Sequence, residues 1–168
     1  IHSSEVAAIR EQLLSWRPES VVVDAEGNAW LRLASNKDED IIGSSAYIPP
    51  PVDEGELIEK LQKFEIKPDS VFGEFMLNFS GLREDYLTSG NFINLSDEWT
   101  TLDQQWEEYD IEGYGAWKDS LWVYHSRGSD TLLLRPDGAV AWFRHAERRI
   151  TKAFDSLTEF LKFYVHFR

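Results

Sequence analysis

The chain of 168 residues contains no cysteine. This absence excludes disulfide bonds, a cysteine nucleophile and thiolate zinc sites. No apolar run approaches the roughly 20 residues that a membrane-spanning helix needs. The glycines form neither a dinucleotide-binding nor a phosphate-binding loop, and no serine stands in a hydrolase nucleophile motif. The sequence therefore predicts no enzyme, no cofactor and no metal site, and the lack of cysteine fits a cytoplasmic protein.

Basic residues are also few, since 17 Lys and Arg stand against 30 Asp and Glu, a formal net charge of −13. The acidity is uneven: residues 1–126 carry a net charge of −16, and residues 127–168 carry +3. Such a chain repels nucleic-acid phosphates and anionic membranes, and it attracts basic partners. The alternative is that the acidic residues only keep the protein soluble. We expect a basic protein partner, with no direct contact to nucleic acid or membrane.

The apolar content of 42% and the aromatic content of 14% favour one folded domain over residues 1–168. Hydrophobic spacing predicts an α+β fold, in which an antiparallel sheet of hairpins is packed by helices. We expect a loop over 34–51, because three consecutive prolines exclude a helix or a central strand there. The expected helices cover 3–16, 53–64, 67–82, the region near 101–109 and 157–165, and the expected strands cover 21–23, 29–33, the region near 91–95, 121–125, 130–135 and 139–145.

Local motifs set several boundaries. Asp53 with Glu56, and Ser156 with Glu159, have the spacing of capping boxes at helix starts. Pro136-Asp137-Gly138 predicts a type I turn between two strands, with glycine in the left-handed position. Residues 1–34 would form an N-terminal helix and hairpin ahead of the rest of the domain.

Segment 97–122 alternates carboxylates with aromatic residues and has Lys118 as its one basic residue. Carboxylates attract a basic partner, and large aromatic side chains supply most of the energy at protein interfaces. The alternative is that the aromatic residues are core and the acids are a solvated face. The predicted partner-binding residues are Asp97, Glu98, Trp99, Trp106, Glu107, Glu108, Tyr109, Asp110, Glu112, Tyr114 and Trp117, with Asp38–Asp40 as a further candidate.

A different class of function, a small-ligand or hydrolytic pocket, would use His125, His145 and Arg144. The two histidines end candidate strands, but a metal needs three or four ligands, so structural roles are favoured. Arg144, Arg148 and Arg149 form a basic cluster that we expect to pair with the protein's own acids.

Residues 72–164 have a definite order of elements. A helix has a glycine-containing end (FGEFMLNFSGL, 72–82), and a tryptophan stands before a strand (AWKDSLWVYH, 116–125). A strand–turn–strand unit (SDTLLLRPDGAVAWFRH, 129–145) and a closing helix after a serine (AFDSLTEFLKFY, 153–164) follow. This order of elements resembles the SMI1/KNR4 superfamily, also called the SUKH fold, over about residues 41–165.

The resemblance implies binding rather than catalysis. Bacterial members of this superfamily look like immunity proteins that neutralise toxins, often nucleases, and fungal members are linked to the regulation of glucan synthesis. A nuclease toxin is basic because it must approach phosphates. We therefore expect an immunity-type protein that binds a basic toxin domain, with a regulatory adaptor as an alternative.

Overall fold

The computed structural model describes residues 20–23, 25, 29–32, 45–48, 53–79, 83–85, 91–106, 110–126 and 128–166. The helix predicted over 3–16 and the residues Asp38–Asp40 lie outside these ranges. The described helices are α2 (Glu54–Lys63), α3 (Val71–Phe79), α4 (Leu102–Gln105), α5 (Tyr114–Trp117) and α6 (Leu157–His166).

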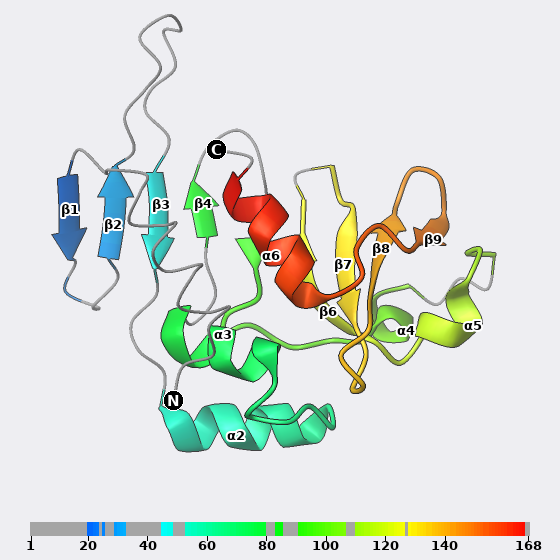
Figure 1. Cartoon of the computed structure of the whole chain (residues 1–168), viewed down its shortest axis with the longest axis horizontal. Helices are drawn as coiled ribbons and strands as arrows, with labels where there is room; N and C mark the ends of the chain where they lie inside the picture. Colours follow the sequence, from blue (N-terminus) through cyan, green and yellow to red (C-terminus); the bar gives the residue numbers. More distant parts are fainter. Residues whose placement is uncertain are drawn as a thin grey trace, which may run out of the picture.

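The described strands form one antiparallel sheet in which each strand pairs with the next along the chain (Figure 1). This meander with helices packed on it confirms the predicted α+β class. The strands are β1 (Ser20–Val23), β2 (Ala29–Arg32), β3 (Ser45–Ile48), β4 (Arg83–Asp85), β5 (Asn91–Phe92), β6 (Leu121–His125), β7 (Thr131–Leu134), β8 (Val140–Arg144) and β9 (Arg149–Thr151).

The prediction of a continuous loop over 34–51 is wrong at its end. Ser45–Ile48 forms β3, which pairs with β2 on one side and with β4 on the other. The prolines do not prevent this, because they follow the strand and remove none of its own amide donors. Strand β4, Arg83–Asp85, is likewise absent from the predicted elements.

The main core lies between one face of the sheet and the helices α2, α3 and α6. A row of side chains across neighbouring strands forms its floor: Phe92 of β5, Tyr124 of β6, Leu132 of β7 and Trp142 of β8. The Phe160 ring of α6 lies 5.1 Å from the Tyr124 ring and 6.0 Å from the Trp142 ring. Aromatic packing therefore ties the closing helix to the centre of the sheet.

The predicted N-cap bonds of Asp53 and Ser156 are present, but neither forms a complete capping box. The Asp53 carboxylate accepts a hydrogen bond from the Glu56 amide at 2.9 Å, at the start of α2. The Ser156 hydroxyl accepts one from the Glu159 amide at 3.1 Å, whereas the Glu159 carboxylate accepts from the amide of Asp155 rather than from that of Ser156. Helix α3 begins at Val71, later than the predicted 67, because the Ser70 hydroxyl caps it by accepting from the Gly73 amide at 3.2 Å.

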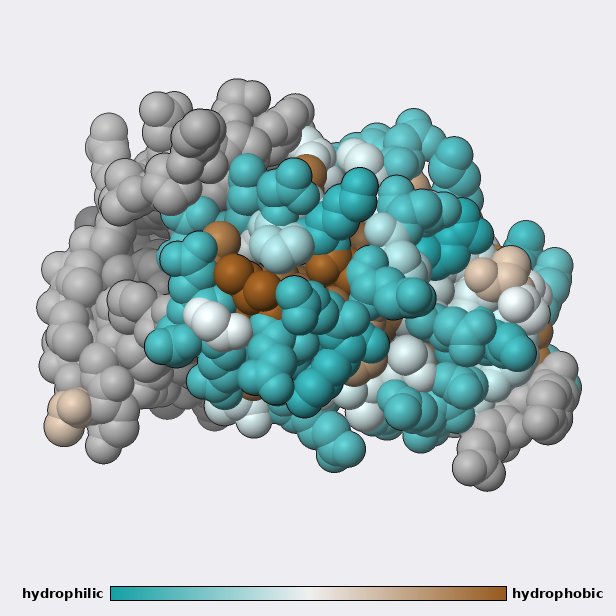
Figure 2. All heavy atoms as spheres, turned by 90° about the horizontal axis from the view of Figure 1, so that it is seen from below, coloured by the Kyte–Doolittle hydropathy of each residue, from teal (hydrophilic) through white to brown (hydrophobic). Residues whose placement is uncertain are grey.

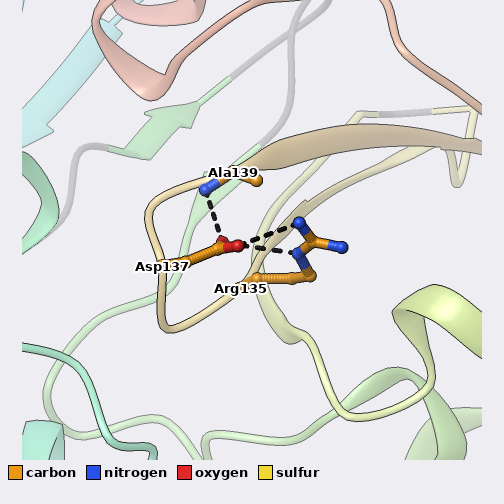
Figure 3. A network of polar contacts seen from close by, with 3 residues as sticks. All are labelled: Arg135, Asp137 and Ala139. Carbon is orange, nitrogen blue, oxygen red and sulfur yellow. Dashed lines mark hydrogen bonds and ion pairs between the residues drawn. The ribbon is translucent and has the colours of Figure 1, made fainter.

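The predicted turn between β7 and β8 is confirmed. Gly138 has a φ of 88°, and its amide donates to the Arg135 carbonyl at 2.9 Å. Figure 3 shows the Asp137 carboxylate held between the Ala139 amide at 3.0 Å and the Arg135 guanidinium at 2.9 Å. The amide of Ala139, and then Arg135, lower the pKa of Asp137 below its ordinary value.

Hydrophilic residues cover most of the described surface on the side where α2 lies, around one recessed hydrophobic patch (Figure 2). Within the described ranges, no helix has both the length and the apolar character needed to cross a membrane.

Candidate functional site

A second apolar cluster lies on the face of the sheet opposite the main core. Its buried members are Leu102, Ile111, Leu133 and Phe143. Half-buried aromatic residues pack against them and keep part of their surface in solvent, namely Trp106, Tyr114, Trp117 and Trp122. We call these four residues the aromatic layer. Among the described elements, the short helices α4 and α5 lie on this face, and the layer stays partly exposed.

Two isolated backbone bridges attach the segment that carries α4 and α5 to the sheet. Near its start, Thr101 forms an antiparallel bridge with Leu121 of β6, and the Trp122 amide donates to the Thr100 carbonyl at 3.0 Å. Farther along, residue 112 forms a parallel bridge with Arg149 of β9. These bridges position the aromatic layer, which limits the entropy lost on binding a partner.

The acidic residues at one end of this segment pair with the basic cluster, as predicted. Arg148 contacts Asp110 at 2.8 Å, and Arg149 contacts Glu112 at 3.7 Å. The carboxylate side chains are 68% and 76% exposed, so each pair stabilises the fold by less than about 1 kcal/mol. Arg144 pairs with Glu147 at 3.0 Å. Asp110 and Glu112 consequently carry less unbalanced charge than the sequence implied.

Trp99 requires a correction. Its side chain is only 5% exposed, and it belongs to the main core rather than to a surface for a partner. The ring packs at 5.7 Å from Phe72 and 5.9 Å from Phe64, and its indole nitrogen donates to the Asn94 carbonyl at 2.8 Å. The alternative interpretation, in which the aromatic residues are core, therefore holds for Trp99 and in part for the aromatic layer.

Lys60 of α2 holds the turn that carries Asp97 and Glu98. Its ammonium group donates to the Leu95 carbonyl and, at 2.5 Å, to the Asp97 carbonyl, and it lies 5.2 Å from the Trp99 ring centre. Burial lowers the pKa of Lys60, while the carboxylates of Glu56 and Asp97 offset part of this effect. The Asp97 carboxylate also accepts from the Asn94 amide at 2.8 Å.

A groove of about 610 Å³ opens where this turn leaves the edge of β6. Residues 91–93 pair with β6, residues 94–99 depart from it, and Thr101 returns to pair with Leu121. The departure leaves a hollow between β5, β6 and α4. The groove is lined by Asn91, Phe92, Ile93, Asp97, Glu98, Thr100, Gln105, Trp106, Trp122, His125 and Ser129.

Three of the predicted residues, Asp97, Glu98 and Trp106, meet in this groove. Tyr114 and Trp117 lie elsewhere on the aromatic layer, with Arg135 stacked 4.6 Å from the Trp117 ring. Glu107, Glu108 and Tyr109 directly follow Trp106 in the chain but lie outside the described residues.

Trp122 falls within the predicted segment 97–122 but is not among its named contact residues, His125 is predicted only for the alternative pocket, and Asn91 is not predicted at all. A β-bulge between Trp122 and Tyr124 shifts the alternation of side chains in β6. Tyr124 turns into the main core, and His125 lines the same groove as Trp122. Strict alternation places Trp122 and Tyr124 on one face and His125 on the other, so the sequence does not predict that His125 and Trp122 line one groove.

The pocket suggested for His125, His145 and Arg144 does not form as predicted. His125 lines the groove, but His145 and Arg144 are not among its lining residues. The His145 ring instead lies 4.6 Å from the Trp106 ring. The backbone amide of His145 donates to the Asp130 carboxylate at 3.0 Å. Among the residues with a described position, no group of three or more His, Asp or Glu side chains is placed to hold a metal ion.

No family model, no curated protein and no solved structure matches this chain.

Proposed function

We propose that this chain is a non-enzymatic, cytoplasmic protein-binding module that neutralises a basic, nuclease-type toxin, as immunity proteins do. The observation that carries this proposal is the aromatic layer with its neighbouring carboxylates, on the face of the sheet opposite α2, α3 and α6. Partly exposed tryptophan and tyrosine side chains on a rigid support are typical of interface hot spots.

Charge supports the same proposal. The segment that carries the layer belongs to the part of the chain with a net charge of −16. A toxin that cleaves nucleic acid must present basic residues to the phosphates, and an acidic binding protein meets these residues directly. Opposite charges accelerate association and oppose wrong partners, which suits an inhibitor that must act before its toxin does. The resemblance to the SMI1/KNR4 superfamily points to the same activity.

The test is capture on the immobilised protein from lysate and culture fluid of the source cells, followed by purification of each bound protein. We expect a basic protein that binds one-to-one and whose nuclease activity the chain inhibits. The variant Trp106→Ala with Glu98→Lys should weaken its binding at least tenfold. The matched control is Asp69→Lys, which reverses an exposed charge in the turn before α3.

Two results contradict the proposal. One is a bound protein with no inhibited activity, which fits a regulatory adaptor instead. The other is a loss of affinity that is equal for Asp69→Lys and for the variant at Trp106 and Glu98, which assigns the binding to net charge rather than to this face.

A small-ligand function is the second candidate, and one observation favours it. The groove volume lies in the range of ligand pockets, about 300–1,000 Å³, and the groove combines tryptophan side chains with an imidazole and amides. A bound small molecule in the mass spectrum of the native protein would support this candidate. Unchanged stability of the protein across a ligand and metal screen would count against it.

A further inference from the structure

We infer that the groove binds a lysine or arginine side chain of the partner, which enters between the carboxylate rim and the tryptophan walls. This inference rests on the proposed function, because it names the chemical group by which a basic partner is anchored. It goes beyond that function by assigning the anchor to one site rather than to the whole acidic surface.

The charge of the groove selects a cation. Asp97 and Glu98 line it, and Glu98 is exposed. Within the described part of the chain no Lys or Arg lines the groove, and the remaining titratable group is His125. Lys60 approaches Asp97 from the side of α2 and balances part of its charge, so Glu98 is the main attraction for an incoming cation.

The walls suit a cation as well. Trp106 and Trp122 are half-buried, and their packing against the second cluster fixes their positions before a partner arrives. Tryptophan is the aromatic side chain that attracts a cation most strongly. A ring held in place by packing loses little entropy on binding, which favours a tight contact.

The chain itself already uses this chemistry at two other tryptophans. The Arg135 guanidinium lies 4.6 Å from the Trp117 ring, and the Lys60 ammonium lies 5.2 Å from the Trp99 ring. Over the described residues, no Lys or Arg of the chain lies on Trp106 or Trp122. These two rings line the groove, where a partner's cation can reach them.

The test uses a defined probe, the peptide acetyl-Gly-Arg-Gly-Arg-Gly-amide, and its analogue in which citrulline replaces arginine. Citrulline keeps nearly the shape of arginine, but its neutral urea lacks the charge and carries a carbonyl oxygen in place of one nitrogen. The protein is labelled with 5-fluorotryptophan, and its ¹⁹F resonances are assigned from single Trp→Phe variants. We expect saturable shifts of the Trp106 and Trp122 resonances with the arginine peptide, an unmoved Trp99 resonance, and at least tenfold weaker binding of the citrulline peptide.

Matched variants locate the charge that matters. Glu98→Gln should lower the affinity for the arginine peptide about fivefold. Glu112→Gln, at an exposed carboxylate outside the groove, should change this affinity less than twofold. Equal effects of the two substitutions would overturn the inference, because they indicate attraction to the whole surface. Equal affinity for the two peptides would also overturn it, as would saturable shifts with the neutral sugar maltotriose and none with the arginine peptide.

Different results would contradict the groove assignment and the proposed function. A captured basic toxin could bind the Glu98→Gln and Trp122→Phe variants as tightly as the unaltered chain. This result would refute the groove as the anchor of the toxin, but it would not contradict the inhibitory function. The groove could bind arginine specifically while the captured partner has no toxic activity. This result would support the groove assignment and refute the immunity function.

Discussion

Replacing Lys60 with methionine tests how the acidic rim of the groove is held in place. The Lys60 ammonium donates to the carbonyls of Leu95 and Asp97 and lies over the Trp99 ring. Methionine keeps most of the length and apolar character of the side chain. The substitution therefore removes the two hydrogen bonds and the cation–ring contact while changing little of the packing around α2.

The expected loss of stability in Lys60→Met follows from the interactions that the substitution removes. A hydrogen bond from a charged donor contributes about 1.5–3 kcal/mol when its partner stays dry, and a cation–ring contact contributes about 0.5–2 kcal/mol. Water replaces part of this stabilisation, because Asp97 and Lys60 are only half-buried. Neutral methionine also avoids the cost of burying the ammonium, the same cost that lowers the pKa of Lys60. We expect Lys60→Met to lower the free energy of unfolding by about 2 kcal/mol.

Urea unfolding at pH 7, followed by tryptophan fluorescence and circular dichroism, measures this free energy. The control is Lys63→Met, which removes an exposed ammonium one turn farther along α2 and should cost less than about 0.5 kcal/mol. Equal stability of the two variants would refute the reasoning. We also expect Lys60→Met to weaken binding of the arginine peptide, because the turn that carries Glu98 loses its attachment to α2.

Four further substitutions test the backbone and the β7–β8 turn. Gly73→Ala should destabilise the protein by at least about 2 kcal/mol in urea unfolding, although alanine favours helices, because its Cβ would lie 2.2 Å from the Pro68 carbonyl oxygen; a stabilised variant would contradict this packing. Gly113→Ala should lower the free energy of unfolding by about 1–2 kcal/mol, because residue 113 has a φ of 87°. Gly115→Ala, whose Cβ meets no atom within 4 Å, should be neutral or stabilising. The reverse order of stability of the two variants in thermal melts would contradict the geometry of α5. Asp137→Asn should lower stability at pH 7 by a small amount that disappears in acid: a carboxyl whose pKa is lowered by folding stabilises the protein above its unfolded pKa, and this contribution is lost as the pH falls through the folded pKa. A difference between Asp137→Asn and the unaltered chain that is unchanged at pH about 2 would show that the charge of Asp137 plays no part.

The predictable parts of the fold are those whose signal is local. β7 and β8 follow from two runs of β-formers around a turn whose glycine needs a positive φ, and the structure has both. The start of α2 follows from the cap at Asp53. These features depend on residues within a few positions of one another, so one sequence contains the information.

The groove depends on contacts between distant residues. Trp99 and Trp106 look equivalent in the sequence, yet one enters the main core and the other the second cluster, because the chain between them rejoins the edge of β6 at Thr101. The bulge that brings His125 beside Trp122 is likewise set by how β6 packs on β7. No pattern within segment 97–122 predicts these pairings. The segment's carboxylates and aromatic residues can be read from the sequence, but which of them are buried in the core and which lie at the surface cannot.

Carbodiimide cross-linking of the captured complex tests the central claim most directly, because this reagent joins a carboxylate to a lysine that touches it. We predict, by mass spectrometry, cross-links from Glu98 and Asp97, which line the groove beside the aromatic layer, to lysines of a basic partner. Cross-links confined to carboxylates of the helical side, such as Glu59 of α2 and Asp155 before α6, would contradict it.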